Sequence, residues 1–259
     1  MTLTEYYGLP EGANMTLQYS SFYDTVNSNF PVQEKMSNLF IGQDKRNVLK
    51  KLTVNTTELN STFKGCTNLV KIEGIEDWNT SKCVNMQYTF EGCKSLTSLD
   101  IANWDVRNVV YMNSIFSNCS SLTSLDISKW NFAKLDNTSF SDAFAACTSL
   151  ETLSSITLPP TYSFPSYQGP FGYSELTKLV NFGGFIGLKT SLISNYGFIR
   201  TPNLSYESCI NVLIGLYDFT GHGEIPNSSQ GQLKVHQNFL DKVGDEISIG
   251  TNKGWTITV

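Results

Sequence analysis

The amino-acid sequence predicts an α/β solenoid, a stack of coils that each contribute one short strand and one short helix. Three columns of residues recur along the 259-residue chain at intervals of 26 to 28 positions and support this fold. The phenylalanine column is Phe63, Phe90, Phe116 and Phe144, and the cysteine column is Cys66, Cys93, Cys119 and Cys147. The tryptophan column is Trp78, Trp104 and Trp130. A strand and a short helix within about 27 residues are the unit of a leucine-rich-repeat solenoid.

The strand of each repeat is expected within the stretch Leu-x-x-Leu-x-Ile. In residues 122–127 this stretch reads Leu-Thr-Ser-Leu-Asp-Ile, and its second half alternates apolar and polar side chains as a half-buried strand does. The helix is expected in residues 109–116, where apolar residues recur at helical spacing. Stacking places equivalent strands about 4.8 Å apart, so each apolar column becomes a continuous interior row.

The repeats are flanked by two segments without a clear repeat pattern. Residues 1–35 are predicted to form an N-terminal cap that covers the open edge of the first coil. Residues 36–203 are predicted to form the leucine-rich-repeat solenoid, and residues 204–259 a C-terminal capping segment. The chain is thus expected to be one array closed at both ends.

Within the C-terminal segment, Ser205 is the expected N-cap of a helix that runs to about Tyr217. Residues 233–235 and 255–259 are candidate strands, and they flank a short helix expected after Gly244. The first helix is longer than the helices expected within the repeats.

The composition excludes several classes of function. Charged residues make up only 16% of the chain, the net charge is -5 and the pI is near 5.1. These values argue against a protein that binds nucleic acid by neutralising phosphates. No apolar run approaches the roughly 20 residues of a membrane span, and the first ten residues show no secretion signal. We therefore expect no nucleic-acid partner and no transmembrane segment.

The cysteines and histidines offer little for metal or cofactor chemistry. The column cysteines stack closely enough for a disulfide in principle, but free buried thiols explain the column as well. The chain has no Cys-x-x-Cys pair and no Cys/His spacing for zinc. His222 and His236 have no nucleophile motif beside them. We expect no cofactor, no metal and no catalytic residue.

One pair of carboxylates leaves an enzymatic alternative open. Asp100 and Asp126 follow equivalent leucines on adjacent predicted strands, so their carboxylates are expected within roughly 5 Å of each other. Such a pair could perform acid-base chemistry or bind calcium. The alternative is that the repeat duplicates its own residues and that both are simply exposed strand residues.

The repeat unit resembles that of a known family. The unit from Phe90 to Trp104 reads F-E-G-C-K-S-L-T-S-L-D-I-A-N-W, and it recurs from Phe116 to Trp130. This pattern is similar to the repeat of BspA-like leucine-rich-repeat surface proteins of anaerobic and gut-associated bacteria. The resemblance covers roughly residues 36–200. It implies a solenoid with an adhesion role at the cell surface or outside the cell, and no catalytic residues.

The expected function is that of a non-enzymatic binding or adhesion protein that presents a sheet face and loops to a protein or glycan partner. The predicted sheet-face residues are Lys71, Glu73, Ser98, Asp100, Ser124, Asp126, Thr152, Ser154 and Lys178. Loops on rigid scaffolds often bind ligands, and the aromatic loop candidates are Tyr162, Phe164 and Tyr167. The alternatives are a structural or receptor-binding component of a phage or other assembly, and, least favoured, a carbohydrate-active enzyme.

Overall fold

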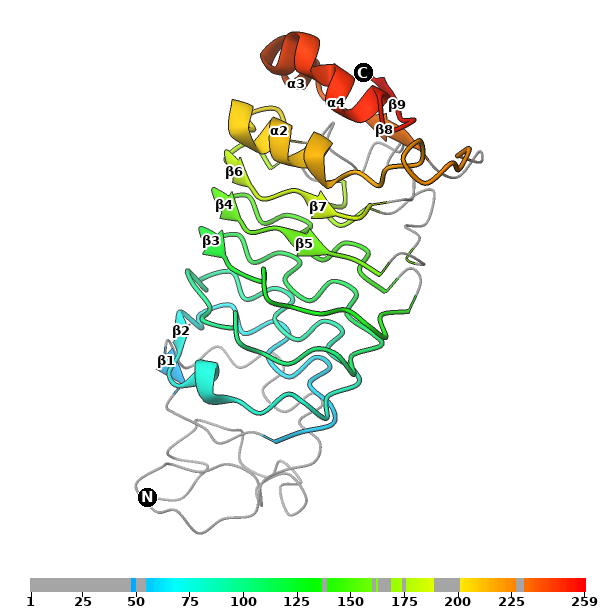
Figure 1. Ribbon diagram of the computed structural model, residues 1–259. Coiled ribbons are helices and arrows are strands. Elements are labelled where there is room, and N and C mark those ends of the chain that lie inside the picture. The colour runs from blue at the N-terminus through cyan, green and yellow to red at the C-terminus, as the bar shows by residue number, and fades with distance from the viewer. Residues whose placement is uncertain are drawn as a thin grey trace, which may run out of the picture.

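The computed structural model describes residues 48–49, 55–136, 139–159, 162, 169–173, 176–188, 201–226 and 231–259. The predicted N-terminal cap, residues 1–35, lies outside them. Successive turns of the chain lie one above another along a single axis and form an elongated column (Figure 1). Equivalent positions of neighbouring coils therefore become neighbours in space.

Short parallel strands join the coils. They are β1 (Val48–Leu49), β2 (Lys71–Ile72), β3 (Ser124–Leu125), β4 (Thr152–Leu153), β5 (Ile156–Thr157), β6 (Asn181–Phe182), β7 (Phe185–Ile186), β8 (Gln232–Lys234) and β9 (Thr256–Thr258). β1 pairs with β2, β5 with β7, and β8 with β9, while β3, β4 and β6 form a three-stranded sheet. All of these pairs are parallel. This is the pairing of a chain that returns to the same edge after each coil.

The strand expected within residues 96–101 is not formed, although Leu99 and Ile101 are buried. The preceding coil is one residue longer here, because nine positions separate Leu69 from Trp78 whereas eight separate Leu96 from Trp104. The 3₁₀ helix η2 (Ile75–Asp77) begins after Gly74, whose φ is 73°. The extra residue lies between Ile72 and Ile75, after the strand position. Within the described residues, β2 and β3 belong to separate sheets.

The helix expected in residues 109–116 is not formed, and residues 113–116 form a turn instead. The amides of Met112, Ser114 and Phe116 each donate over 3.0 Å to a carbonyl oxygen of the next coil. In an α-helix these amides would bond to carbonyls four residues back. Because they bond between coils instead, a helix cannot form in this segment. Backbone hydrogen bonds therefore join neighbouring coils in this segment as well as at the strands.

In four coils, the residue directly before the column cysteine has a left-handed backbone conformation. The residues at this position are Gly65 (φ 73°), Gly92 (75°), Asn118 (60°) and Ala146 (57°). A side chain in this region places Cβ against the following carbonyl, at a cost of about 1–2 kcal/mol. Glycine has no Cβ and avoids that cost.

We expect Ala146→Gly to raise the free energy of unfolding by about 1 kcal/mol, because it relieves the left-handed strain. The matched control is Ala145→Gly, whose backbone φ is not positive and which should lose about 0.5–1 kcal/mol. Urea unfolding of the two variants measures both effects. An unfolding free energy for Ala146→Gly below that of the wild type would contradict this account.

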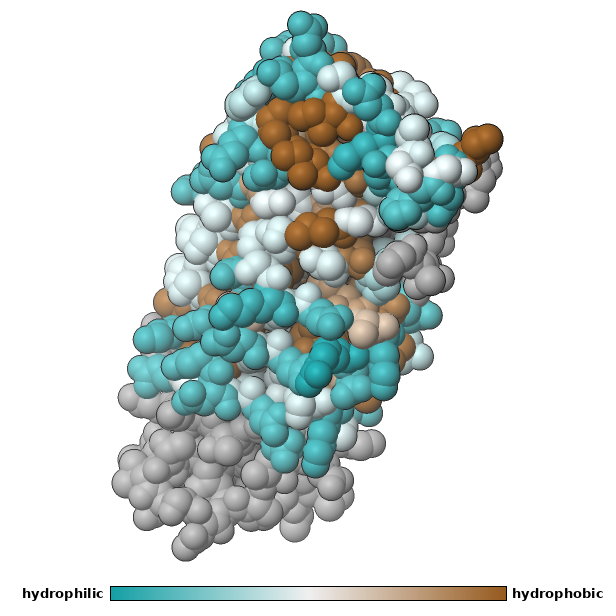
Figure 2. All heavy atoms as spheres, viewed as in Figure 1, coloured by the Kyte–Doolittle hydropathy of each residue, from teal (hydrophilic) through white to brown (hydrophobic). Residues whose placement is uncertain are grey.

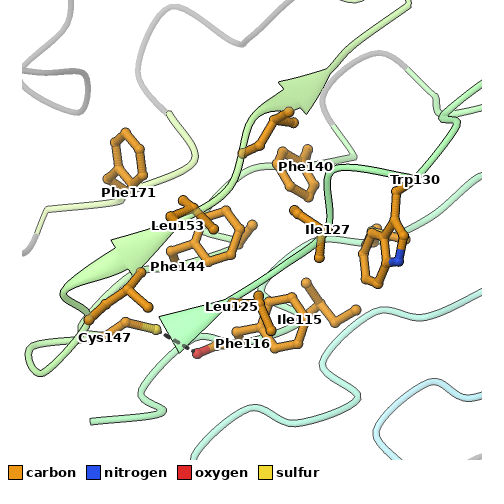
Figure 3. Packing of buried hydrophobic residues seen from close by; sticks show 14 of the residues in the cluster. Ile115, Phe116, Leu125, Ile127, Trp130, Phe140, Phe144, Cys147, Leu153 and Phe171 are labelled. Atoms are coloured by element: carbon orange, nitrogen blue, oxygen red, sulfur yellow. Dashed lines mark hydrogen bonds between the residues drawn. The ribbon is translucent and has the colours of Figure 1, made fainter. Parts of the chain in front are cut away.

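Aromatic side chains fill the interior in two stacked rows. Phe116 lies between Phe90 and Phe144 with ring-centroid distances of 5.8 Å and 5.7 Å, and the rings of Phe116 and Phe144 are seen among the other buried side chains in Figure 3. Trp104 and Trp130 stack at 6.3 Å with planes 3° apart. Each indole Nε1–H donates over 2.9 Å to a carbonyl of the preceding coil. The polar ends of Trp104 and Trp130 are therefore satisfied inside the core, whereas the buried Trp78 Nε1 has no hydrogen-bond partner among the described residues.

The C-terminal segment begins with α2 (Tyr206–Gly215). The Ser205 Oγ accepts a hydrogen bond from the Ser208 amide at 3.1 Å, which confirms the predicted N-cap. The helix ends two residues before the predicted Tyr217. It takes the place of the next coil, because Leu188 and Leu216 form a parallel bridge. The open edge of β6 and β7 is thereby covered (Figure 1).

Three short helices lie between the last two strands. They are α3 (Gln237–Val243), η3 (Gly244–Ile247) and α4 (Ser248–Thr251). β8 and β9 lie at the two predicted strand positions, each within one residue at its start. Across the described parts of the chain, every helix is too short or too polar to cross a lipid bilayer.

Candidate functional site

One row of exposed polar side chains crosses the three-stranded sheet. Ser124 pairs in register with Thr152, and Thr152 with Asn181. All three side chains are exposed, whereas their strand neighbours Leu125 and Leu153 are buried. The alternation of the strands therefore places a hydroxyl, a hydroxyl and a carboxamide side by side on one outer face.

A second row lies two residues further along the strands. Asp126 Oδ1 accepts from the amide of Ser128 at 2.9 Å and from its hydroxyl at 2.7 Å. Ser154 Oγ accepts from the Ile127 amide at 2.8 Å. The hydrogen bonds from Ser128 hold the pKa of Asp126 below its usual range. The Asp126 carboxylate thus stabilises a local turn, and an acid that donates a proton would need a raised pKa instead.

The structure brings only part of the predicted sheet face together. Lys71 lies in β2, which belongs to a different sheet, and Ser98 and Asp100 lie in the segment without strand pairing. Lys178 is exposed three residues before β6, and Glu73 is half-buried beside η2. The continuous face is therefore the one built by β3, β4 and β6.

The structure corrects the expectation for Tyr162. This side chain is only 4% exposed, and its hydroxyl accepts a hydrogen bond from the Phe140 amide at 2.8 Å. It closes the interior beside Phe140 and is inaccessible to a partner. The other two loop candidates, Phe164 and Tyr167, lie outside the described residues.

A polar hollow of about 210 Å³ lies where this face meets α2. Its walls are Thr152 and Asn181 from the sheet, and Glu207, Ser208 and Asn211 from the helix. The Ser208 hydroxyl joins the two walls, because it accepts from the Phe182 amide at 2.8 Å and donates to the Val180 carbonyl at 2.9 Å. The position of the hollow is therefore fixed by backbone contacts.

The part of this site that α2 contributes was not predicted. Residues 204–259 were expected to form a cap, and none of them was expected to bind a partner. A usable signal was present, because Glu207, Asn211 and Ile214 share one helix face that is distinct from the buried Val212 and Leu213. The helical spacing of these residues therefore predicted one face of α2 that does not pack into the core.

A second hollow of about 240 Å³ lies near the tryptophan side of the column. Asp105 and Arg107 form a salt bridge of 2.7 Å along it, and Lys129 donates to Asn103 Oδ1 at 2.9 Å. Both cations in this hollow already bind acceptors from the same surface. Arg107 and Lys129 are therefore already paired with other side chains that line this hollow.

The histidines have structural contacts. His236 Nδ1 accepts from the Asn238 amide at 3.1 Å and caps the N-terminus of α3. The His222 ring stacks on Tyr217 with centroids 5.1 Å apart. In the described part of the chain, no group of three or more His, Cys, Asp or Glu side chains is arranged to hold a metal ion.

The column cysteines are hydrogen-bonded thiols. The Sγ atoms of Cys93, Cys119 and Cys147 each donate over 3.1 Å to a phenylalanine carbonyl of the preceding coil. All six cysteines are free and buried. Burial raises the pKa of Cys83 and Cys147 to about 12 and that of Cys209 to about 11.

We expect none of the six thiols to react with a thiol reagent at pH 8 while the chain is folded. With a pKa of about 12, as for Cys147, only about one thiol in ten thousand is ionised at that pH, and the thiolate is the reactive form. The measurement is a colorimetric thiol titration with and without 8 M urea. Six equivalents released only in urea agree with the structure, and rapid release from the folded chain contradicts it.

Comparison with known proteins gives one match. Residues 34–155 match a protein family described as "Mycoplasma protein of unknown function, DUF285". No curated protein and no solved structure matches the chain. The matched range includes the described coils from residue 55 to β4 and ends before β6 and α2.

Proposed function

We propose that the chain is a leucine-rich-repeat solenoid that acts as a non-enzymatic binding protein, with the face of β3, β4 and β6 presented to a macromolecular partner. The observation that supports this is the in-register row of Ser124, Thr152 and Asn181 above a buried row of leucine and phenylalanine. Such outer side chains can change without disturbing the core. A rigid face of this kind suits recognition of a large partner surface.

The setting we propose is the bacterial surface. It rests on the resemblance of the repeat unit to BspA-like surface proteins, and the match of residues 34–155 to a family of Mycoplasma proteins is compatible with it. In that setting the partner is a protein or a glycan. The stacked interior is the support for the face and takes no part in binding.

The test is binding of the full chain to arrays of glycans and extracellular-matrix proteins. A variant with Ser124→Lys and Thr152→Lys replaces two hydroxyls of the exposed row and leaves the buried neighbours intact. We expect it to lose at least tenfold in affinity for any ligand found. Ala133→Lys is the control, because Ala133 is exposed but lies in a turn at residues 133–134, outside the strands.

Two results would contradict the proposal. One is the absence of any ligand on both arrays for the wild-type chain. The other is equal binding by the wild type and the sheet-face variant, which would place the contact elsewhere on the molecule. Circular dichroism of all three proteins establishes that the comparison is between folded chains.

A further inference from the structure

Four residues form a stripe along the outer face of α2, and the stripe is acidic at one end and aliphatic at the other. Glu207, Ile210, Asn211 and Ile214 are spaced i, i+3, i+4 and i+7, so they lie on one side of the helix. The opposite side packs into the core through Ser208, Cys209, Val212 and Leu213. The stripe begins with a carboxylate and ends with an aliphatic side chain.

The acidic end of the stripe opens into the polar hollow. The Glu207 carboxylate is exposed and makes no hydrogen bond or ion pair with any residue that the structure describes. Two carboxamides beside it are weakly engaged, because Asn181 Nδ2 lies 3.4 Å from Thr152 Oγ1 and Asn211 Nδ2 lies 3.5 Å from the Phe182 carbonyl. Bonds of this length are easily exchanged for better ones. This end therefore offers a free negative charge with hydrogen-bonding groups around it.

The other end of the stripe is an exposed aliphatic patch. Ile214 is 58% exposed, and Ile186 of β7 is 47% exposed. Ile186 and Ile214 lie on adjoining segments of backbone, because the Gly187 amide donates to the Gly215 carbonyl at 2.8 Å and Leu188 bridges to Leu216. Figure 2 shows hydrophobic side chains gathered over α2, with a smaller group over β7. These side chains offer apolar area that a partner could remove from water.

We propose that this stripe, together with Ile186, binds an extended segment of a partner protein that carries a lysine or arginine two to four residues from an isoleucine, leucine or valine. This inference rests on the proposed function and names the class of partner. Glu207 and Ile214 are seven residues apart, which is about 10.5 Å along the helix. About three extended residues span that distance.

The chemistry of the stripe favours a protein over a glycan. A free carboxylate attracts a basic side chain, and the net charge of -5 on the whole chain adds to this attraction. The apolar end is aliphatic, so it fits aliphatic side chains, whereas sugar rings are usually held on flat aromatic faces. A peptide can satisfy both ends at once.

The test is selection of random nine-residue peptides, displayed on phage, against the full chain. We expect enriched peptides to pair Lys or Arg with Ile, Leu or Val at the stated spacing. Synthetic versions should bind Glu207→Lys at least tenfold more weakly, and a fresh selection against that variant should enrich Asp or Glu instead. The control is Glu76→Lys, which makes the same change of charge on an exposed residue of η2.

The apolar end has its own matched pair of variants. Ile214→Ser should weaken peptide binding at least fivefold, whereas Ile225→Ser should not, because Ile225 is 91% exposed but lies in the loop that follows Phe219, away from the stripe. Glu207→Gln keeps the size of the side chain, and it serves in place of Glu207→Lys if that variant unfolds. Thermal unfolding of each variant identifies the folded ones.

Several results would overturn the inference. Peptides enriched without a basic residue, or bound equally by Glu207→Lys, would show that the carboxylate is not the contact. A dimer in solution that Ile214→Ser dissociates would show that a second copy of the chain covers the stripe. A glycan ligand lost only in the sheet-face variant, with no peptide enriched, would remove this inference and leave the proposed function standing. Failure of both the arrays and the selection would remove both.

Discussion

Phe116→Ala is expected to lower the free energy of unfolding by about 3–5 kcal/mol, the range for removing a fully buried phenylalanine. The Phe116 ring is 0% exposed and contacts stacked rings on both sides, at 5.8 Å and 5.7 Å. Its loss leaves a cavity between two coils that are held in place by backbone bonds, including the 3.0 Å bond from the Phe116 amide to the Ala143 carbonyl. The coils cannot close the gap without breaking that ladder.

Urea denaturation followed by circular dichroism measures this effect. Tyr173→Ala is the control, because it removes an aromatic side chain that is 66% exposed and should change the stability by less than about 1 kcal/mol. Equal losses for the two variants would show that the phenylalanine row does not hold the coils together.

Gly215→Ala is expected to destabilise the chain by about 3 kcal/mol, at the upper end of the range for overpacking. Helix propensity alone predicts the opposite, since alanine is better than glycine in a helix by about 1 kcal/mol. A Cβ on residue 215, however, would lie 2.0 Å from the Phe185 carbonyl oxygen. The Phe185 carbonyl belongs to the backbone and cannot rotate out of the way as a flexible side chain can. The helix α2 must therefore move away from β7. The clash therefore outweighs the propensity.

The measurement is amide hydrogen exchange, resolved by segment. Protection should fall in residues 206–216 and at β7, and stay unchanged at β3. Gly187→Ala is the control, because a Cβ there meets nothing within 4 Å, although its φ of 74° costs about 1–2 kcal/mol. A Gly215→Ala variant more stable than the wild type would mean that α2 does not lie this close to β7.

The interior rows could be predicted because they depend on periodicity alone. The spacing of Phe90 and Phe116 indicated equivalent positions, and equivalence in a stack implies contact. The local structure of residues 109–116 could not be predicted in the same way. Apolar residues at helical spacing are compatible with a run of turns as well as with a helix. The turns form here because the amides bond to carbonyls of the next coil, as the Met112 amide does to the Ser139 carbonyl.

The candidate site shows the same limit. The outward row of Ser124 and Thr152 followed from strand alternation, but the burial of Tyr162 depends on the Phe140 amide 22 residues earlier in the chain. The position of Glu207 beside Asn181 depends on α2 taking the place of a coil. The exposed face of α2 can be predicted from helical spacing, but neither of these two contacts can be predicted from the local sequence. Long-range contacts thus decided which polar residues are gathered and which are enclosed.

The replacement of a coil by α2 has a consequence for how this molecule can vary in length. Each coil bonds to its neighbours through equivalent backbone positions, and α2 bonds to the last coil in the same register. A whole coil gained or lost within the array would move the terminal stripe along the axis by about 4.8 Å. The stripe would keep its own residues and its own support. The number of coils therefore sets the position of the stripe along the axis, and the terminal helix sets which residues the stripe presents. The two properties can change independently.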